Sequence, residues 1–161
     1  MGMYTKFRFK AELIPETPWQ VQNILRCLIY GIPLPENEWE IYRGHRFFQC
    51  QRASCLCNGA DGKFPPNTRR SEIYRLHEKE GYVYFVDIIS AFKNYDNEKF
   101  HFLGWIWPFI AKEPDKYMGW YRYDEDDVAT NIYQDKESFR FVRRDDEEYF
   151  KNKHFPNHER S

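Results

Sequence analysis

The stretch Tyr4-Thr5-Lys6-Phe7-Arg8-Phe9-Lys10-Ala11-Glu12-Leu13 alternates between apolar or small side chains and charged ones. Successive residues of a strand point to opposite faces of its sheet, so the stretch predicts a strand with one buried and one charged face. Its central triplet, Phe7-Arg8-Phe9, has two counterparts later in the chain, Tyr121-Arg122-Tyr123 and Phe139-Arg140-Phe141. If the three triplets share a sheet, their rings form a core on one face and the three arginines lie on the other.

The composition sets the broad class of the protein. The chain has 161 residues, of which 19% are aromatic and 30% are charged, and its formal net charge is −1. We expect a single domain with a ring-rich core, because each aromatic side chain buries about 150–250 Å². The near-neutral charge argues against duplex nucleic acid as a partner. No apolar run approaches the roughly 20 residues of a membrane span, and a secretory signal is missing, so we expect a soluble, cytoplasmic protein with no membrane partner.

Hydrophobic spacing predicts two helices. Thr17 as N-cap and Pro18 open the first helix, and Gly31 ends it in a left-handed C-cap. The second helix follows Asp96 and is apolar over most of its circumference; Gly104 is expected to allow the close approach of another element, and Pro108 to end or kink the helix.

The remaining segments predict strands. Besides the first, strands are expected from residue 45 or 46 to 56 and at 71–78, 82–92, 116–123, 130–134 and 139–143, with a connector at 32–44 and a loop at 58–70. The predicted fold is α+β, a mainly antiparallel sheet with two helices packed on one face. We assign residues 1–144 to a single α+β domain and 145–161 to a polar tail whose composition is typical of disorder.

Asp87 is the most unusual single residue, because it lies within an otherwise apolar predicted strand. A buried carboxylate is costly unless it has a partner. One interpretation makes Asp87 a general base or an acceptor for the polar edge of a ligand. The other makes it a structural partner of Arg8, Arg122 or Arg140. Only the first interpretation makes a ligand-binding site, consisting of Asp87 with Arg8, Arg122 and Arg140.

Other polar clusters predict little chemistry. The acidic run Asp124-Glu125-Asp126-Asp127 lacks the spacing of a calcium loop. It predicts either a solvated turn or a surface that docks onto a basic partner, and the acidic run 145–148 would extend this surface. Of the five histidines, only His154 and His158 are four residues apart, and they lie in the polar tail, so we predict no metal site there. We expect reduced thiols, no metal and no cofactor, although a metal site or a disulfide at Cys50, Cys55 and Cys57 stays open. No catalytic residue set is assembled.

Several motifs resemble small uncharacterised proteins of phages and prophages. They are Tyr4-Thr5-x-Phe7-x-Phe9, Thr17-Pro18, Asn94-Tyr95-Asp96, Phe102-Leu103-Gly104-Trp105-Ile106-x-Pro108 and Met118-Gly119-Trp120-x-Arg122-Tyr123-x-Glu125. The similarity spans about residues 4 to 133. It implies a mobile-element setting and transfers no catalytic residue. The cysteine-rich stretch 50–57 and the segment after Gln134 depart from the pattern.

Three functional hypotheses follow. The first is a non-enzymatic protein that acts through a protein–protein interface, as a modulator of a host system, with Trp39, Trp105, Trp120 and the acidic turn 124–127 as contact residues. The second is a binding protein or enzyme for a nucleotide or another phosphorylated molecule, with its pocket at Asp87 and the sheet arginines. The third is a module for single-stranded nucleic acid, whose bases would stack on rings of the arginine-bearing face.

Overall fold

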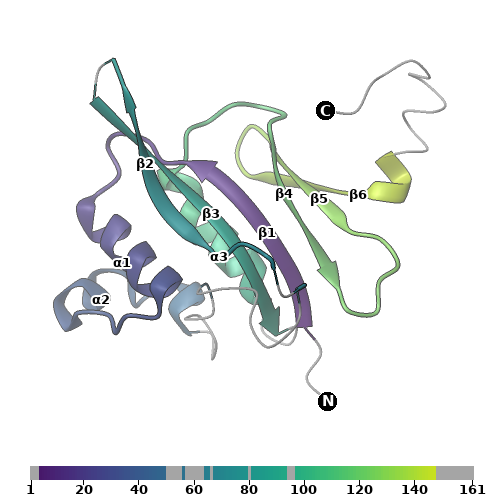
Figure 1. The fold of residues 1–161 in the computed structure, drawn as a ribbon, viewed down its shortest axis with the longest axis horizontal. Coiled ribbons are helices and arrows are strands. Elements are labelled where there is room, and N and C mark those ends of the chain that lie inside the picture. Colours follow the sequence, from purple (N-terminus) through teal and green to yellow (C-terminus); the bar gives the residue numbers. More distant parts are fainter. Residues whose placement is uncertain are drawn as a thin grey trace.

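The computed structural model describes residues 4–49, 56, 64–65, 67–79, 81–93 and 97–147. In these residues the chain forms a six-stranded antiparallel sheet with helices on one face (Figure 1). The predicted α+β class is therefore confirmed.

The strands are β1 (Tyr4–Glu12), β2 (Glu72–Glu78), β3 (Gly81–Lys93), β4 (Tyr117–Tyr123), β5 (Thr130–Gln134) and β6 (Phe139–Arg143). Their order in the sheet is β2-β3-β1-β4-β5-β6, so the first strand of the chain lies in the interior of the sheet. The helices are α1 (Trp19–Tyr30), α2 (Glu36–Tyr42) and α3 (Glu98–Ile106), with short 3-10 helices at Arg46–Gln49 and Trp107–Phe109.

The strand register puts all three aromatic–Arg–aromatic triplets in this sheet, as predicted. Phe7 is paired with Tyr121, and Ile132 of β5 is paired with Phe141. Cross-strand partners share a face, so these residues all belong to the side covered by α1 and α3, which we call the helix face. Arg8, Arg122 and Arg140 alternate with them and occupy the opposite side, which we call the arginine face.

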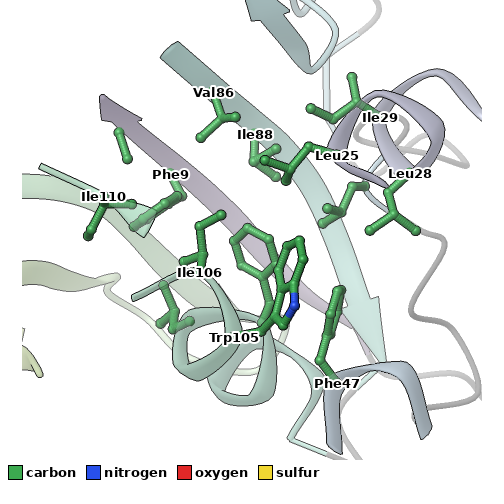
Figure 2. Close-up of a cluster of buried hydrophobic side chains, with 14 of the residues drawn as sticks. Phe9, Leu25, Leu28, Ile29, Phe47, Val86, Ile88, Trp105, Ile106 and Ile110 are labelled. Carbon is green, nitrogen blue, oxygen red and sulfur yellow. The ribbon is translucent and has the colours of Figure 1, made fainter. Parts of the chain in front are cut away.

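Rings form the centre of the core on the helix face. Phe102 of α3 contacts Phe7 and Phe9 edge-on, with both centroid distances at 5.9 Å. Phe47 reaches Phe102 at 5.4 Å. Figure 2 shows Trp105 and Phe47 below Leu25, Leu28 and Ile29 of α1, with Phe9 of β1 to the left, all in one buried cluster. Edge-to-face ring pairs of this kind stabilise a core beyond the area that they bury.

The segment after α1 differs from the prediction in two places. Residues 36–42 form helix α2, where a connector was expected, and residues 46–49 form a 3-10 helix, where a strand was expected. Phe47 and Phe48 are both buried, at 0% and 7% exposure. Neighbouring residues of a strand face opposite ways, whereas a helical turn lets both rings contact Trp105.

Two local expectations were also wrong. Thr17 is not an N-cap: its Oγ1 donates to the carbonyls of Ile14 and Phe109, at 2.7 and 3.2 Å, and thereby ties the start of α1 to the 3-10 helix after α3. Gly104 lies on the exposed side of α3, and a Cβ at this position would meet no atom within 4 Å. The left-handed C-cap at Gly31 is confirmed, with φ 68°. No helix in the described residues has the length and apolar character that a membrane span requires.

Candidate binding site on the arginine face

A hollow of about 410 Å³ opens on the arginine face beside β1 and β4. The residues that line it are Arg8, Lys10, Tyr117, Met118, Gly119 and Trp120. Its volume is within the range of about 300–1,000 Å³ that is typical of small-molecule sites. Two cationic side chains and two aromatic rings therefore border one small space.

A β-bulge in β4 brings the two rings to the same face. The register of β4 against β5 shifts between Tyr117 and Gly119. Tyr117 is paired with Tyr133, and Trp120 with Asn131, so both rings belong to the arginine face although they are three residues apart. In a regular strand an odd separation would place them on opposite faces.

Gly119 permits the close contact of β1 and β4 beneath the hollow. A Cβ built on Gly119 would lie 1.9 Å from the carbonyl oxygen of Arg8, and its φ of +148° is one that other residues rarely adopt. The bulge and the glycine together position Arg8 opposite Trp120.

The cations differ in how they are held. The side chain of Arg8 is 40% exposed, and its Nη2 lies 4.0 Å from Oδ1 of Asp87 on β3. Lys10 is exposed and lies over the ring of Tyr74, 5.8 Å from its centroid. The Asp87 carboxylate thus orients the guanidinium of Arg8, while Lys10 stays accessible to a ligand.

Asp87 is fully buried, and its principal partner is Arg69, which donates to Oδ2. The same guanidinium reaches Glu72, with Nη1 3.9 Å from Oε1. Oδ1 of Asp87 accepts no hydrogen bond from the described residues and faces Arg8. This geometry favours the structural interpretation of Asp87, because the carboxylate is covered and charge-paired.

The other two sheet arginines lie outside the hollow. Arg122 donates from Nε to the carbonyl of Asp126 at 2.8 Å and closes the turn between β4 and β5. Arg140 donates to Oδ1 of Asp115 at 2.9 Å, and this hydrogen bond raises the pKa of the guanidinium. Its guanidinium also lies over the ring of Tyr133, 5.3 Å away. Of the four predicted ligand-binding residues, the structure brings together only Arg8 and Asp87.

The segment after β6 folds back onto the arginine face. The guanidinium of Arg144 lies over the Trp120 ring at 5.6 Å and donates to Oδ1 of Asn131 at 2.9 Å. The carboxylate of Glu147 accepts from Nδ2 of Asn131, at 2.5 Å, and from the hydroxyl of Tyr133. Burial and the nearby Glu147 carboxylate raise the pKa of Tyr133 to about 12. The Glu147 carboxylate is therefore an anion that side-chain donors of this face bind.

The residues proposed for a protein interface do not form one surface. Trp105 is 3% exposed and belongs to the core, so it presents no surface to a partner. Trp120 borders the hollow, and the side chain of Trp39 in α2 lies outside the described residues. In the turn 124–127, Asp124 accepts the backbone N–H of Tyr4 at 2.9 Å.

No metal site is formed by the described residues. They contain no group of three or more histidine, cysteine, aspartate or glutamate side chains suited to a metal ion. Burial and the charge of His101 lower the pKa of His45, while His77 contacts Tyr82 on the β2–β3 hairpin. Cys27 is buried and forms no disulfide with another described residue, and Cys50, Cys55 and Cys57 lie outside the described residues.

Three residues of the site were not singled out from the sequence. Lys10 was visible as a member of the charged face of the first strand. Tyr117 could not be assigned, because strand parity gives the wrong face when a bulge intervenes. Arg69 lay in a predicted loop, and no periodicity links it to Asp87.

Comparison of the chain with protein-family models, with curated proteins and with solved structures finds no match in any of the three. The use of this site must therefore be inferred from the residues that form it.

Proposed function

We propose that the protein binds a small phosphorylated molecule with a planar ring, of the nucleotide class, in the hollow on the arginine face. The observation that carries the proposal is the juxtaposition of Arg8 and Lys10 with Tyr117 and Trp120 around one space of about 410 Å³. The Asp87 carboxylate behind Arg8 is buried and paired with Arg69, so it does not occupy the mouth of the hollow.

The four side chains suit the phosphate group and the planar ring of such a ligand. Arg8 presents a planar guanidinium that can donate two parallel hydrogen bonds to a phosphate, and Lys10 adds a point charge. Tyr117 is 48% exposed and offers a ring face on which a base can stack. Trp120 already carries Arg144 on its ring, so it acts as a wall of the hollow rather than as the main stacking platform.

A thermal-unfolding screen with nucleoside monophosphates tests the proposal. A ligand at 100 times its dissociation constant stabilises the folded state by about 2.7 kcal/mol. For a protein of this size that corresponds to a rise in Tm of about 5–10 °C. Inorganic phosphate alone should give a smaller rise, because it leaves the rings unused.

Matched variants locate the binding. Lys10→Ala and Tyr117→Ala should each weaken nucleotide binding, measured by calorimetry. Arg75→Ala removes the same charge from the exposed part of β2, where Arg75 lies over Tyr82, and should leave the affinity unchanged. Equal affinities for all three variants, or no thermal shift with any nucleotide, would refute the proposal.

A protein partner is the second candidate function, and one surface favours it. Phe100 and Phe141 are 37% and 39% exposed, and their rings lie 5.2 Å apart at the outer part of the helix face. Lys99 lies over the rings of Phe100 and Tyr121, and Asp126 of the acidic turn is its charged neighbour. Exposed aromatic anchors beside a charged rim are typical of protein interfaces.

In this second function the protein would modulate a host system, which is the mobile-element setting that we expected from the sequence motifs. The double variant Phe100→Ser/Phe141→Ser should abolish capture of a host protein while leaving nucleotide binding intact. Retention of the partner by this variant would exclude the aromatic surface.

A further inference from the structure

The geometry points to a longer binding track, in which the hollow is one end of a path for single-stranded nucleic acid across the arginine face. The inference rests on the proposed function, because it uses the same nucleotide site and adds a second one. The second site is formed by Arg140, Tyr133 and Tyr117 at the β5–β6 side of the sheet.

Two neighbouring rows of side chains cross the sheet at this place. In the first row Arg8, Trp120 and Asn131 are successive cross-strand partners. In the second row Tyr117, Tyr133 and Arg140 are partners across β4, β5 and β6. Cross-strand partners share a face, so both rows belong to the arginine face.

The rings of the second row form a continuous surface. Tyr117 and Tyr133 meet edge-on at 5.6 Å, and Arg140 covers the ring of Tyr133 at 5.3 Å. Tyr117 also lines the hollow, so it connects the two sites. Rings beside guanidinium groups bind single strands without sequence preference, because bases stack on the rings and phosphates follow the cations. Here the exposed ring of Tyr117 is the stacking surface, and Arg140, which also donates to Asp115, is the cation.

The track is longer than one nucleotide. Arg8 on β1 and Arg140 on β6 are separated by three strand-to-strand steps, which gives about 14 Å. A stacked strand rises by about 3.4 Å per nucleotide. A single nucleotide therefore cannot engage both cations, whereas a short oligonucleotide can.

An anion already lies on this path. The carboxylate of Glu147 accepts from Asn131 in the first row and from Tyr133 in the second. The donors that hold this carboxylate are those that a phosphate oxygen would use. Arg8, Lys10 and Arg140 together with the Tyr117 ring thus suit the phosphates and bases of a single strand, although the whole chain has a net charge of −1.

The test compares a labelled ten-nucleotide oligothymidylate with thymidine monophosphate. We expect the oligonucleotide to bind at least about fivefold more tightly, because each further stacked base adds to the affinity. Arg140→Ala should weaken oligonucleotide binding and leave the mononucleotide affinity unchanged. It should also make the slope of log K against log salt less negative by about 0.7, the value for one lost phosphate contact on a single strand. Arg75→Ala is the control of equal charge.

The outcomes separate the two proposals. Equal affinities for the oligonucleotide and the mononucleotide, or an Arg140→Ala variant that behaves like Arg75→Ala, overturn the track and leave the small-molecule site standing. Oligonucleotide binding that depends on Arg140, without measurable mononucleotide binding, supports the track and refutes the small-molecule function.

Discussion

The two faces of the sheet are built from the same alternating strands and serve different purposes. On the helix face, Phe7 and Phe9 are completely buried among other rings. On the arginine face, Arg8 lies between them in sequence and remains 40% exposed at the border of a hollow. One strand therefore contributes both to the core and to the candidate site. A substitution on its buried face can change stability and leave the site intact, and a substitution on its exposed face can change the site and leave stability intact.

The largest effect is expected on the helix face. Phe7→Ala removes a fully buried ring that contacts Phe9, Phe92 and Phe102, and should lower the free energy of unfolding by about 3–5 kcal/mol. Phe141→Ala is the matched control at a 39% exposed position and should cost about 1 kcal/mol. Urea denaturation measures both. Similar costs for the two variants would show that the greater burial of Phe7 does not translate into stability.

The contact between β1 and β4 should be the next most sensitive. Gly119→Ala forces an unfavourable φ, which alone costs about 1–3 kcal/mol, and the overlap with the Arg8 carbonyl adds to this cost. Gly104→Ala, at an open helix position, should instead stabilise the protein by about 0.5–1 kcal/mol. If Gly119→Ala keeps the wild-type Tm, the bulge does not have the described geometry.

A smaller loss of stability is expected at Asp87, the buried carboxylate of the arginine face. Asp87→Asn removes the charge that faces Arg69 and Arg8, and should cost about 1–3 kcal/mol. Glu72→Gln removes a second, partly exposed partner of Arg69 and should cost less than about 0.5 kcal/mol. Equal costs in chemical denaturation would mean that burial does not distinguish the two carboxylates.

The smallest effect concerns the acidic segment that covers part of the arginine face. The pKa of Tyr133 is raised from 10.0 to about 12, so the folded state favours the neutral phenol. The resulting stabilisation is complete below pH 10 and is lost as the pH rises from 10 to about 12.

In an ultraviolet titration, Tyr133→Phe should remove one late-ionising tyrosine; burial also raises the pKa values of Tyr42 and Tyr121, so these two remain. Glu147→Gln should shift the pKa of Tyr133 back toward 10, because the carboxylate contributes to the shift. An unchanged number of late-ionising tyrosines in Tyr133→Phe would show that Tyr133 is not one of them.

Much of the sheet could be predicted from the sequence because strand alternation is a local signal. The triplets, the hairpin of β2 and β3, and the end of α3 before Pro108 were all found from residue spacing. Helix α2 was missed because residues 32–44 were interpreted as a connector, although Pro35, directly before Glu36, also suits a helix start. The 3-10 helix at residues 46–49 was missed because Phe47 and Phe48 obtain their partners from the distant α3.

The candidate site was predictable only in part. Strand parity predicted that Arg8, Arg122 and Arg140 lie on the same face. It could not predict which of these arginines would be hydrogen-bonded to a neighbouring residue. Arg122 is held by a backbone carbonyl in its turn, and Arg140 by Asp115. The partner Arg69 and the ring of Tyr117 depend on a loop path and on a bulge, and neither has a periodic signature.

The interior position of β1 has a consequence for folding. Its neighbours are β3 and β4, so Phe7 is paired with Ser90 and with Tyr121, more than 80 and 110 residues later in the chain. Contacts at such separation slow folding, because the entropy of closing a long loop is lost before any pairing is gained. During synthesis the rings of β1 therefore stay uncovered until Phe102 of α3 has emerged, and one edge of β1 stays unpaired until β4 follows, so this strand is where a growing chain would need chaperone protection most.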